Sequence, residues 1–149
     1  MDSIGGDVAR RATIAERDTA VREASSRTLH TLQTSDAPRD ARYTSPDPAV
    51  DRVWRALSDV ADPELPISLV DLGLIRDVRR NGGMVEVDVT FTATACPCMG
   101  FIIQDVRERL LQEEDVQSVD VRDVWDPPWS SDLMTAHGKA LLQRFGVAA

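Results

Sequence analysis

The chain has 149 residues, of which 42% are hydrophobic, and a net charge of −8. This length fits one domain with some tail, and the hydrophobic fraction is sufficient for a core. The acidic balance argues against nucleic acid as the main partner, because phosphate contacts need a basic surface. No apolar run approaches the length of a membrane span, and the acidic N-terminus lacks the hydrophobic region of a secretory signal.

The charge divides the chain into two parts. Residues 1–45 hold seven acidic residues and seven arginines, whereas residues 46–149 hold the other 18 acidic residues against 10 basic ones. The first part is rich in Ser, Thr and Arg, and it ends in Ser45-Pro46-Asp47-Pro48. This composition predicts a flexible N-terminal arm over 1–45 and a folded domain over 46–149. The alternative for the arm is a docking segment that folds on a partner.

The domain is predicted to begin with a helix over 48–60. Asp47 is typical of a helix N-cap and Pro48 of the first helical position, and an apolar stripe follows at helical spacing. The turn Asp62-Pro63-Glu64-Leu65-Pro66 ends the helix, because its two prolines cannot continue it. The two carboxylates of this turn could cap the chain, bind a metal or hold a loop, and capping is the commonest of these roles.

A two-stranded hairpin is predicted next. The first strand covers 70–78, and Asn81-Gly82-Gly83 tolerates the positive φ angles of a tight turn. The returning strand has apolar side chains at 85, 87, 89 and 91 with polar ones between them. One face of the sheet is therefore buried and the other is partly exposed to water.

Three more elements are predicted after the hairpin. Apolar residues at steps of three and four predict a helix over 99–113, and residues 116–125 predict a third strand. Ser130 or Ser131 is expected to cap a last helix that ends near 145. The order helix, strand, strand, helix, strand, helix predicts a small α+β domain with a three-stranded mixed sheet packed by helices.

Cys96 and Cys98 lie between the second predicted strand and the following helix. A thiol near a helix N-terminus meets the positive end of the helix dipole, which favours the thiolate that binds metal or attacks an electrophile. The alternative is that both cysteines only pack in the core. Two cysteines one residue apart make a strained structural disulfide, so we expect reduced thiols in a cytoplasmic protein.

The cysteines provide at most two soft ligands, whereas a closed zinc or iron–sulfur site usually has four. A metal held here would occupy an open site, be shared across a homodimer, or be passed onward. Carboxylates from Asp62, Glu64 or Asp71 could complete an open site. A cysteine enzyme would need a base, and His137 is the only histidine of the predicted domain, so we do not expect an enzyme.

Two tryptophans, Trp125 and Trp129, flank a Pro-Pro turn. An aromatic and proline cluster usually seals the edge of a core. If the rings are exposed, they would instead anchor a partner protein.

Four motifs in this order resemble the metal–sulfur cluster assembly factor family. They are Asp62-Pro63-Glu64-Leu65-Pro66, Val70-Asp71-Leu72-Gly73-Leu74-Ile75, Thr94-Ala95-Cys96-Pro97 and Val124-Trp125-Asp126-Pro127-Pro128-Trp129. The family includes SufT, the phenylacetate-degradation protein PaaD and the eukaryotic cytosolic iron–sulfur targeting factor, and its domain also precedes some cluster-carrying P-loop ATPases. The resemblance covers about residues 47–146.

The resemblance implies an α/β fold with an accessible cysteine after the second strand. The cysteine of the family falls on Cys96, its acidic positions fall on Asp62, Glu64 and Asp71, and Thr94 belongs to the same loop motif. Cys98 stands where the family usually has methionine or leucine. Members help to mature metalloproteins, which implies a transient iron–sulfur cluster or iron as cofactor.

Three hypotheses follow for the function. The first is a maturation factor that assembles or transfers iron–sulfur clusters for client metalloproteins through Cys96, with Cys98 as a second ligand. The second is a non-catalytic accessory protein dedicated to one metal-dependent multicomponent oxygenase, in which the N-terminal arm and the region of Trp125 and Trp129 form the docking surface. The third is a protein interaction domain with buried cysteines.

Overall fold

The computed structural model describes residues 40–147. The chain divides into two units, Met1–Asp36 and Ala37–Ala149, and all the described residues belong to the second one. Most of the arm predicted over 1–45 therefore lies outside the described residues. Within the part that is described, no helix is long and apolar enough to cross a membrane.

The centre of the folded unit is a three-stranded mixed sheet, which confirms the predicted fold class. Its strands are β1 (Ile75–Asn81), β2 (Met84–Val89) and β3 (Ser118–Asp123), in the order β1-β2-β3. The pair β1 and β2 is antiparallel, and β2 and β3 are parallel. A parallel pair needs a crossover connection, and the helix between β2 and β3 provides it.

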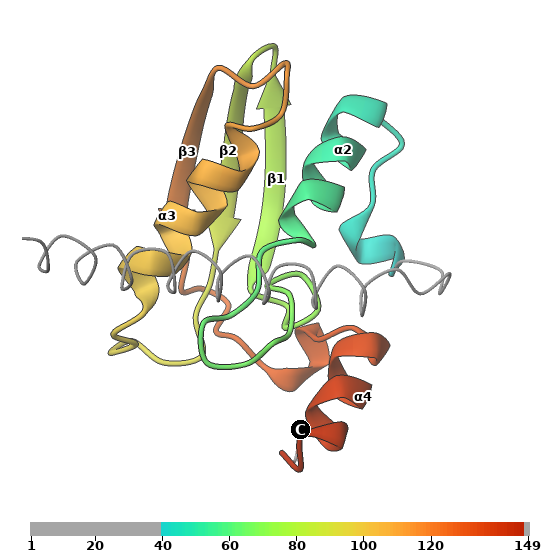
Figure 1. The fold of residues 1–149 in the computed structure, drawn as a ribbon, viewed down its shortest axis with the longest axis vertical. Helices are drawn as coiled ribbons and strands as arrows, with labels where there is room; N and C mark the ends of the chain where they lie inside the picture. The colour runs from blue at the N-terminus through green and yellow to red at the C-terminus, as the bar shows by residue number, and fades with distance from the viewer. Residues whose placement is uncertain (1–39, 148–149) are drawn as a thin grey trace, which may run out of the picture. The chain divides into compact units, whose positions relative to one another are not determined.

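Helices cover one face of this sheet and close one end of it (Figure 1). Helix α2 (Pro48–Leu57) packs on β1, and α3 (Met99–Leu110) packs on β3 and on α2. The last helix, α4 (Ala136–Arg144), follows the short helix η2 (Ser131–Leu133) at the lower end of the view. The connections from α2 to β1, from β2 to α3 and from β3 to η2 lie at this lower end, whereas the β1–β2 turn and the α3–β3 connection lie at the opposite end (Figure 1).

Local sequence accounts for the confirmed elements. The Asp47 carboxylate accepts a hydrogen bond from the Ala49 amide at 2.8 Å, and Pro48 is the first residue of α2, as predicted. Gly82 has a positive φ of 57° in the turn between β1 and β2. The strict alternation also holds, because the three valines of β2 that were predicted to face the core are fully buried; they are Val85, Val87 and Val89.

Several predicted helices and strands begin or end at other residues in the structure. The first strand begins at Ile75 and not at 70, because residues 70–73 form a turn in which the Leu72 amide donates to the Ser68 carbonyl at 2.9 Å. The last helix is capped by Thr135 and not by Ser130 or Ser131, since the Thr135 hydroxyl accepts from the Gly138 amide at 2.9 Å. The helices predicted over 48–60 and 99–113 and the strand over 116–125 are each shorter than predicted.

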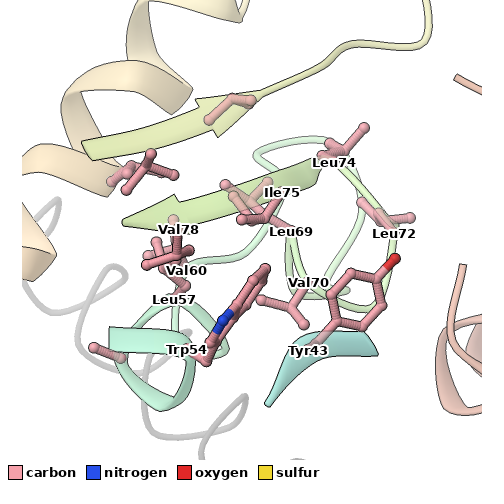
Figure 2. Close-up of a cluster of buried hydrophobic side chains, with 14 of the residues drawn as sticks. Tyr43, Trp54, Leu57, Val60, Leu69, Val70, Leu72, Leu74, Ile75 and Val78 are labelled. Carbon is pink, nitrogen blue, oxygen red and sulfur yellow. The ribbon is translucent and has the colours of Figure 1, made fainter. Parts of the chain in front are cut away.

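The folded unit also begins before the predicted boundary at 46. The short helix η1 (Ala41–Tyr43) places the Tyr43 ring in the core, 5.5 Å from the Trp54 ring between centroids (Figure 2). The Tyr43 hydroxyl donates to the Leu133 carbonyl, and Arg42 donates to the Met134 carbonyl at 3.1 Å. Residues 40–45 thus tie the start of the domain to the segment before α4.

Candidate functional site

The two cysteines lie where the sequence analysis expected them, between a strand and a helix. After β2 the chain leaves the core at the buried Phe91 and forms an exposed loop over 92–97. Cys98 is the N-cap residue of α3, and its carbonyl accepts from the Ile102 amide at 3.0 Å. Both cysteines are free and half-buried, and Cys98 packs against the core.

The turn over 62–66 is organised by its first carboxylate. Asp62 Oδ1 accepts hydrogen bonds from the Glu64 amide at 2.8 Å and from the Leu65 amide at 3.0 Å. The Asp62 amide donates to the Ile67 carbonyl at 3.0 Å, which closes the turn. Asp62 therefore has the capping role that the sequence analysis considered commonest, and the Glu64 side chain is exposed.

The fold brings this acidic turn to the cysteine loop. The pKa of the Cys98 thiol is raised by partial burial, by the neighbouring Cys96 and by the carboxylates of Glu64 and Asp62. In Figure 1 the cysteine loop (yellow) and the acidic turn (green) lie at the same end of the sheet. The direction of this pKa is opposite to the one expected from the helix N-terminus alone.

A substitution tests this arrangement. We expect Glu64→Gln to lower the pKa of the Cys98 thiol, because it removes a negative charge that opposes ionisation. More of the thiol would then be thiolate at neutral pH, and alkylation by iodoacetamide would be faster. The rate is measured against pH in a Cys96→Ser background, where only Cys98 reacts, with Glu114→Gln as a control on an exposed carboxylate. An unchanged profile for Glu64→Gln would contradict the placement of Glu64.

Asp71, one of the acidic positions of the resemblance, is hydrogen-bonded within the fold. Its carboxylate accepts from the hydroxyls of Ser68, at 2.9 Å, and Thr135. The Nδ1 atom of His137 lies 3.1 Å from Asp71 Oδ2, so the only candidate base of the domain is held by this carboxylate. Asp71 therefore joins the turn before β1 to the start of α4, and it is not among the groups that act on Cys98.

We expect Asp71→Ala to destabilise the domain by about 1.5–3 kcal/mol, because three polar groups lose a charged partner. The free energy of unfolding in urea measures this loss. Asp120→Ala is the matched control, since Asp120 lies on β3 away from these partners and its removal should change stability by less than about 0.5 kcal/mol. Equal effects of the two substitutions would contradict the role of Asp71.

The remaining predicted site residues lie on the surface or against the core. Thr94 is exposed in the cysteine loop. Trp125 is half-buried, with its ring 5.8 Å from the Phe91 ring between centroids. Trp129 is also half-buried, and its Nε1 donates to the Leu72 carbonyl at 2.9 Å. Both tryptophans pack against the core, so a partner-binding role for them stays a prediction.

Few side chains that could bind a metal lie at the thiols. Among residues 40–147 there is no group of three or more His, Cys, Asp or Glu side chains that could hold a metal ion. The chemistry of Cys96 and Cys98 suits iron or a cluster, but two soft ligands do not form a closed site. The arrangement can therefore make an open site that shares ligands with another molecule.

One residue near the thiols was not among the predicted site residues. Phe101 lies in the first turn of α3 and is 67% exposed. The signal was present in the sequence, because Phe101 falls off the apolar stripe of this helix and shares its polar side with Asp105 and Glu108.

Known proteins match this chain in sequence and in fold. The sequence model of a family described as iron–sulfur cluster assembly protein matches residues 50–121. The Fe–S protein maturation auxiliary factor SufT of Staphylococcus aureus is 39% identical over 84 residues, which are 56% of this chain and 96% of SufT.

A second relative is larger. A protein of Escherichia coli named as a putative subunit of the 1,2-phenylacetyl-CoA epoxidase is 31% identical over 102 residues, which are 68% of this chain and 61% of that protein. A crystal structure of a DUF59 domain from Bacillus anthracis has a TM-score of 0.59 and 33% identity, and the match covers 63% of this chain and 91% of that one. The chain belongs to the family of iron–sulfur cluster assembly proteins.

Proposed function

We propose that this protein promotes the assembly of iron–sulfur clusters, or their transfer, in client metalloproteins, and that Cys96 is the thiol on which the activity depends. The observation that carries the proposal is the pair of half-exposed thiols at a strand-to-helix junction, beside an acidic turn. Membership of the cluster assembly family and the name of the SufT relative support the same function.

The cluster or its iron is the cargo of the protein in this proposal. A site with two thiol ligands leaves coordination positions open, so a recipient protein can supply the remaining ligands. The carboxylates of Asp62 and Glu64 disfavour an anionic Cys98 and favour a cation nearby. The side chains would thus attract iron while keeping Cys98 protonated when no metal is bound, and a metal ligand must lose that proton.

In this proposal the protein acts as a carrier or an adaptor and does not turn over a substrate of its own. Reduced thiols fit the cytoplasm. A homodimer would bring two pairs of cysteines together, which gives the four thiol ligands of a closed cluster.

A second candidate function is an accessory protein dedicated to one metal-dependent oxygenase. The similarity to the epoxidase protein of Escherichia coli favours it, and the half-buried tryptophans after β3 would lie in the docking surface. The third hypothesis required buried cysteines, whereas both cysteines are only half-buried, so the burial it needs is incomplete.

Complementation in cells tests the proposal. Removal of the protein should lower the activity of a [4Fe–4S] dehydratase without lowering the amount of its polypeptide, and the wild-type chain should restore that activity. If dehydratase activity stays normal while a single oxygenase loses activity, the accessory function replaces the proposed one. Normal activity of both enzymes would contradict both functions.

A further inference from the structure

Phe101 is an exposed aromatic side chain next to the thiols. It is 67% exposed, more than the other large hydrophobic side chains on the described surface, whose exposed fractions are 43–48%. It lies three residues after Cys98, so both residues fall on the same side of α3. A single exposed hydrophobic residue is common on protein surfaces. Phe101 is a candidate for binding because it lies close to the thiols.

The surface around Phe101 is open. The loop before α3 carries small apolar residues on either side of Cys96; they are Ala93, Ala95 and Pro97. A Cβ atom added to Gly100 would meet nothing within 4 Å, so another chain can approach the backbone closely here. The core does not include the Phe101 ring, which leaves the ring available for a partner.

The same surface is acidic. Asp105 and Glu108 lie four and seven residues after Phe101, which places all three on one side of the helix. Both carboxylates are exposed, and Glu108 accepts a hydrogen bond from Gln104 at 2.7 Å. Glu64 acts on Cys98 from the neighbouring turn. A partner of complementary charge would therefore carry lysine or arginine residues.

We propose that Phe101 anchors a basic and apolar segment of the client protein and so holds the client beside Cys96 and Cys98. The partner segment has an apolar side chain that covers the Phe101 ring, flanked by lysine or arginine residues that face Asp105 and Glu108. Aromatic anchors surrounded by polar residues are typical of the side chains that dominate binding at interfaces. This inference rests on the proposed function for the identity of the partner, but the surface binds whether or not a cluster is transferred.

A binding measurement with the full chain tests the inference. The probe is a short fluorescein-labelled peptide of lysine and leucine, compared with an analogue that has glutamate in place of lysine. Fluorescence anisotropy should show binding of the lysine peptide only, and Phe101→Ala should weaken it about tenfold or more. Phe145→Ala is the matched control, because Phe145 is also an exposed phenylalanine, at 48%, but lies at the end of α4.

A charge variant completes the experiment. Glu108→Lys should weaken binding of the lysine peptide, and added salt should reduce the difference between this variant and the wild type. Equal losses in Phe101→Ala and Phe145→Ala, or binding of the glutamate analogue as tight as that of the lysine peptide, would overturn the inference. A shift from dimer to monomer in Phe101→Ala without peptide binding would also overturn it, because the partner would then be a second copy.

Client maturation is measured separately from peptide binding, so that the proposed function and the binding surface are tested independently. If the inference holds, Phe101→Ala should raise the client concentration needed for half-maximal maturation, and the rate at saturating client should stay unchanged. Loss of the saturating rate in Phe101→Ala, with peptide binding intact, would contradict a docking role. Failure of the wild-type protein to support maturation would count against the proposed function and not against the binding surface.

Discussion

Gly73→Ala should strongly destabilise the domain. Gly73 has a positive φ of 70°, and a Cβ atom there would lie 2.4 Å from the Leu133 carbonyl oxygen. The left-handed conformation costs about 1–2 kcal/mol for a residue with a side chain, and overpacking against fixed backbone costs about 1–3 kcal/mol. Unfolding in urea should therefore show a loss of about 2–5 kcal/mol, a large part of the stability of a small domain.

Gly82→Ala separates the two causes of this loss. Gly82 also has a positive φ, of 57°, but an added Cβ atom would meet nothing within 4 Å. This control should lose only the conformational part, about 1–2 kcal/mol. If the two variants lose the same free energy of unfolding, the contact between the turn before β1 and the segment before α4 is not the one described.

Cys96→Ser should abolish client maturation, which is the largest functional effect we expect. A serine hydroxyl stays protonated near neutral pH and is a poor ligand for iron compared with a thiolate. Cys96 is half-buried in an irregular loop, so the exchange of sulfur for oxygen should leave stability within about 1 kcal/mol. In cells that lack the protein, the activity of a [4Fe–4S] dehydratase should stay at the level of the empty control.

Cys98→Ser is the matched comparison for this result. The pKa of its thiol is raised by partial burial and by the neighbouring Cys96, Glu64 and Asp62, which disfavours a resting thiolate at Cys98. We expect Cys98→Ser to keep part of the maturation activity. Full activity of Cys96→Ser, or a greater loss in Cys98→Ser, would contradict the assignment of Cys96 as the functional thiol.

The sequence predicted the parts of the fold that depend on local patterns. The alternation from 85 to 91 and the N-cap at Asp47 were confirmed because each is decided by residues that are close in sequence. The start of the first strand was wrong because hydrophobic residues over 70–74 are buried in a turn as well as they would be in a strand. Burial alone does not distinguish the two.

The neighbours of the site residues could not be predicted from the sequence, because tertiary contacts determine them. The spacing of Cys96 and Cys98 predicted a thiol pair at a helix N-terminus, but not the carboxylates that, after burial and Cys96, contribute to the raised pKa of Cys98. Those carboxylates come from a turn more than thirty residues earlier in the chain. Asp71 was considered as one of three carboxylates that could complete an open site, and the sequence did not reveal its partners, which are Ser68 and groups at the start of α4.

The most direct test of the central claim is the activation of a purified apo-dehydratase under anaerobic conditions with iron, sulfide and the full chain. The account predicts that the wild-type protein accelerates the return of dehydratase activity and that Cys96→Ser does not. Iron and sulfide counted on the isolated chain would then distinguish a carrier, which binds both, from an adaptor, which binds neither. Equal acceleration by the wild type and by Cys96→Ser would contradict a maturation activity that depends on this thiol.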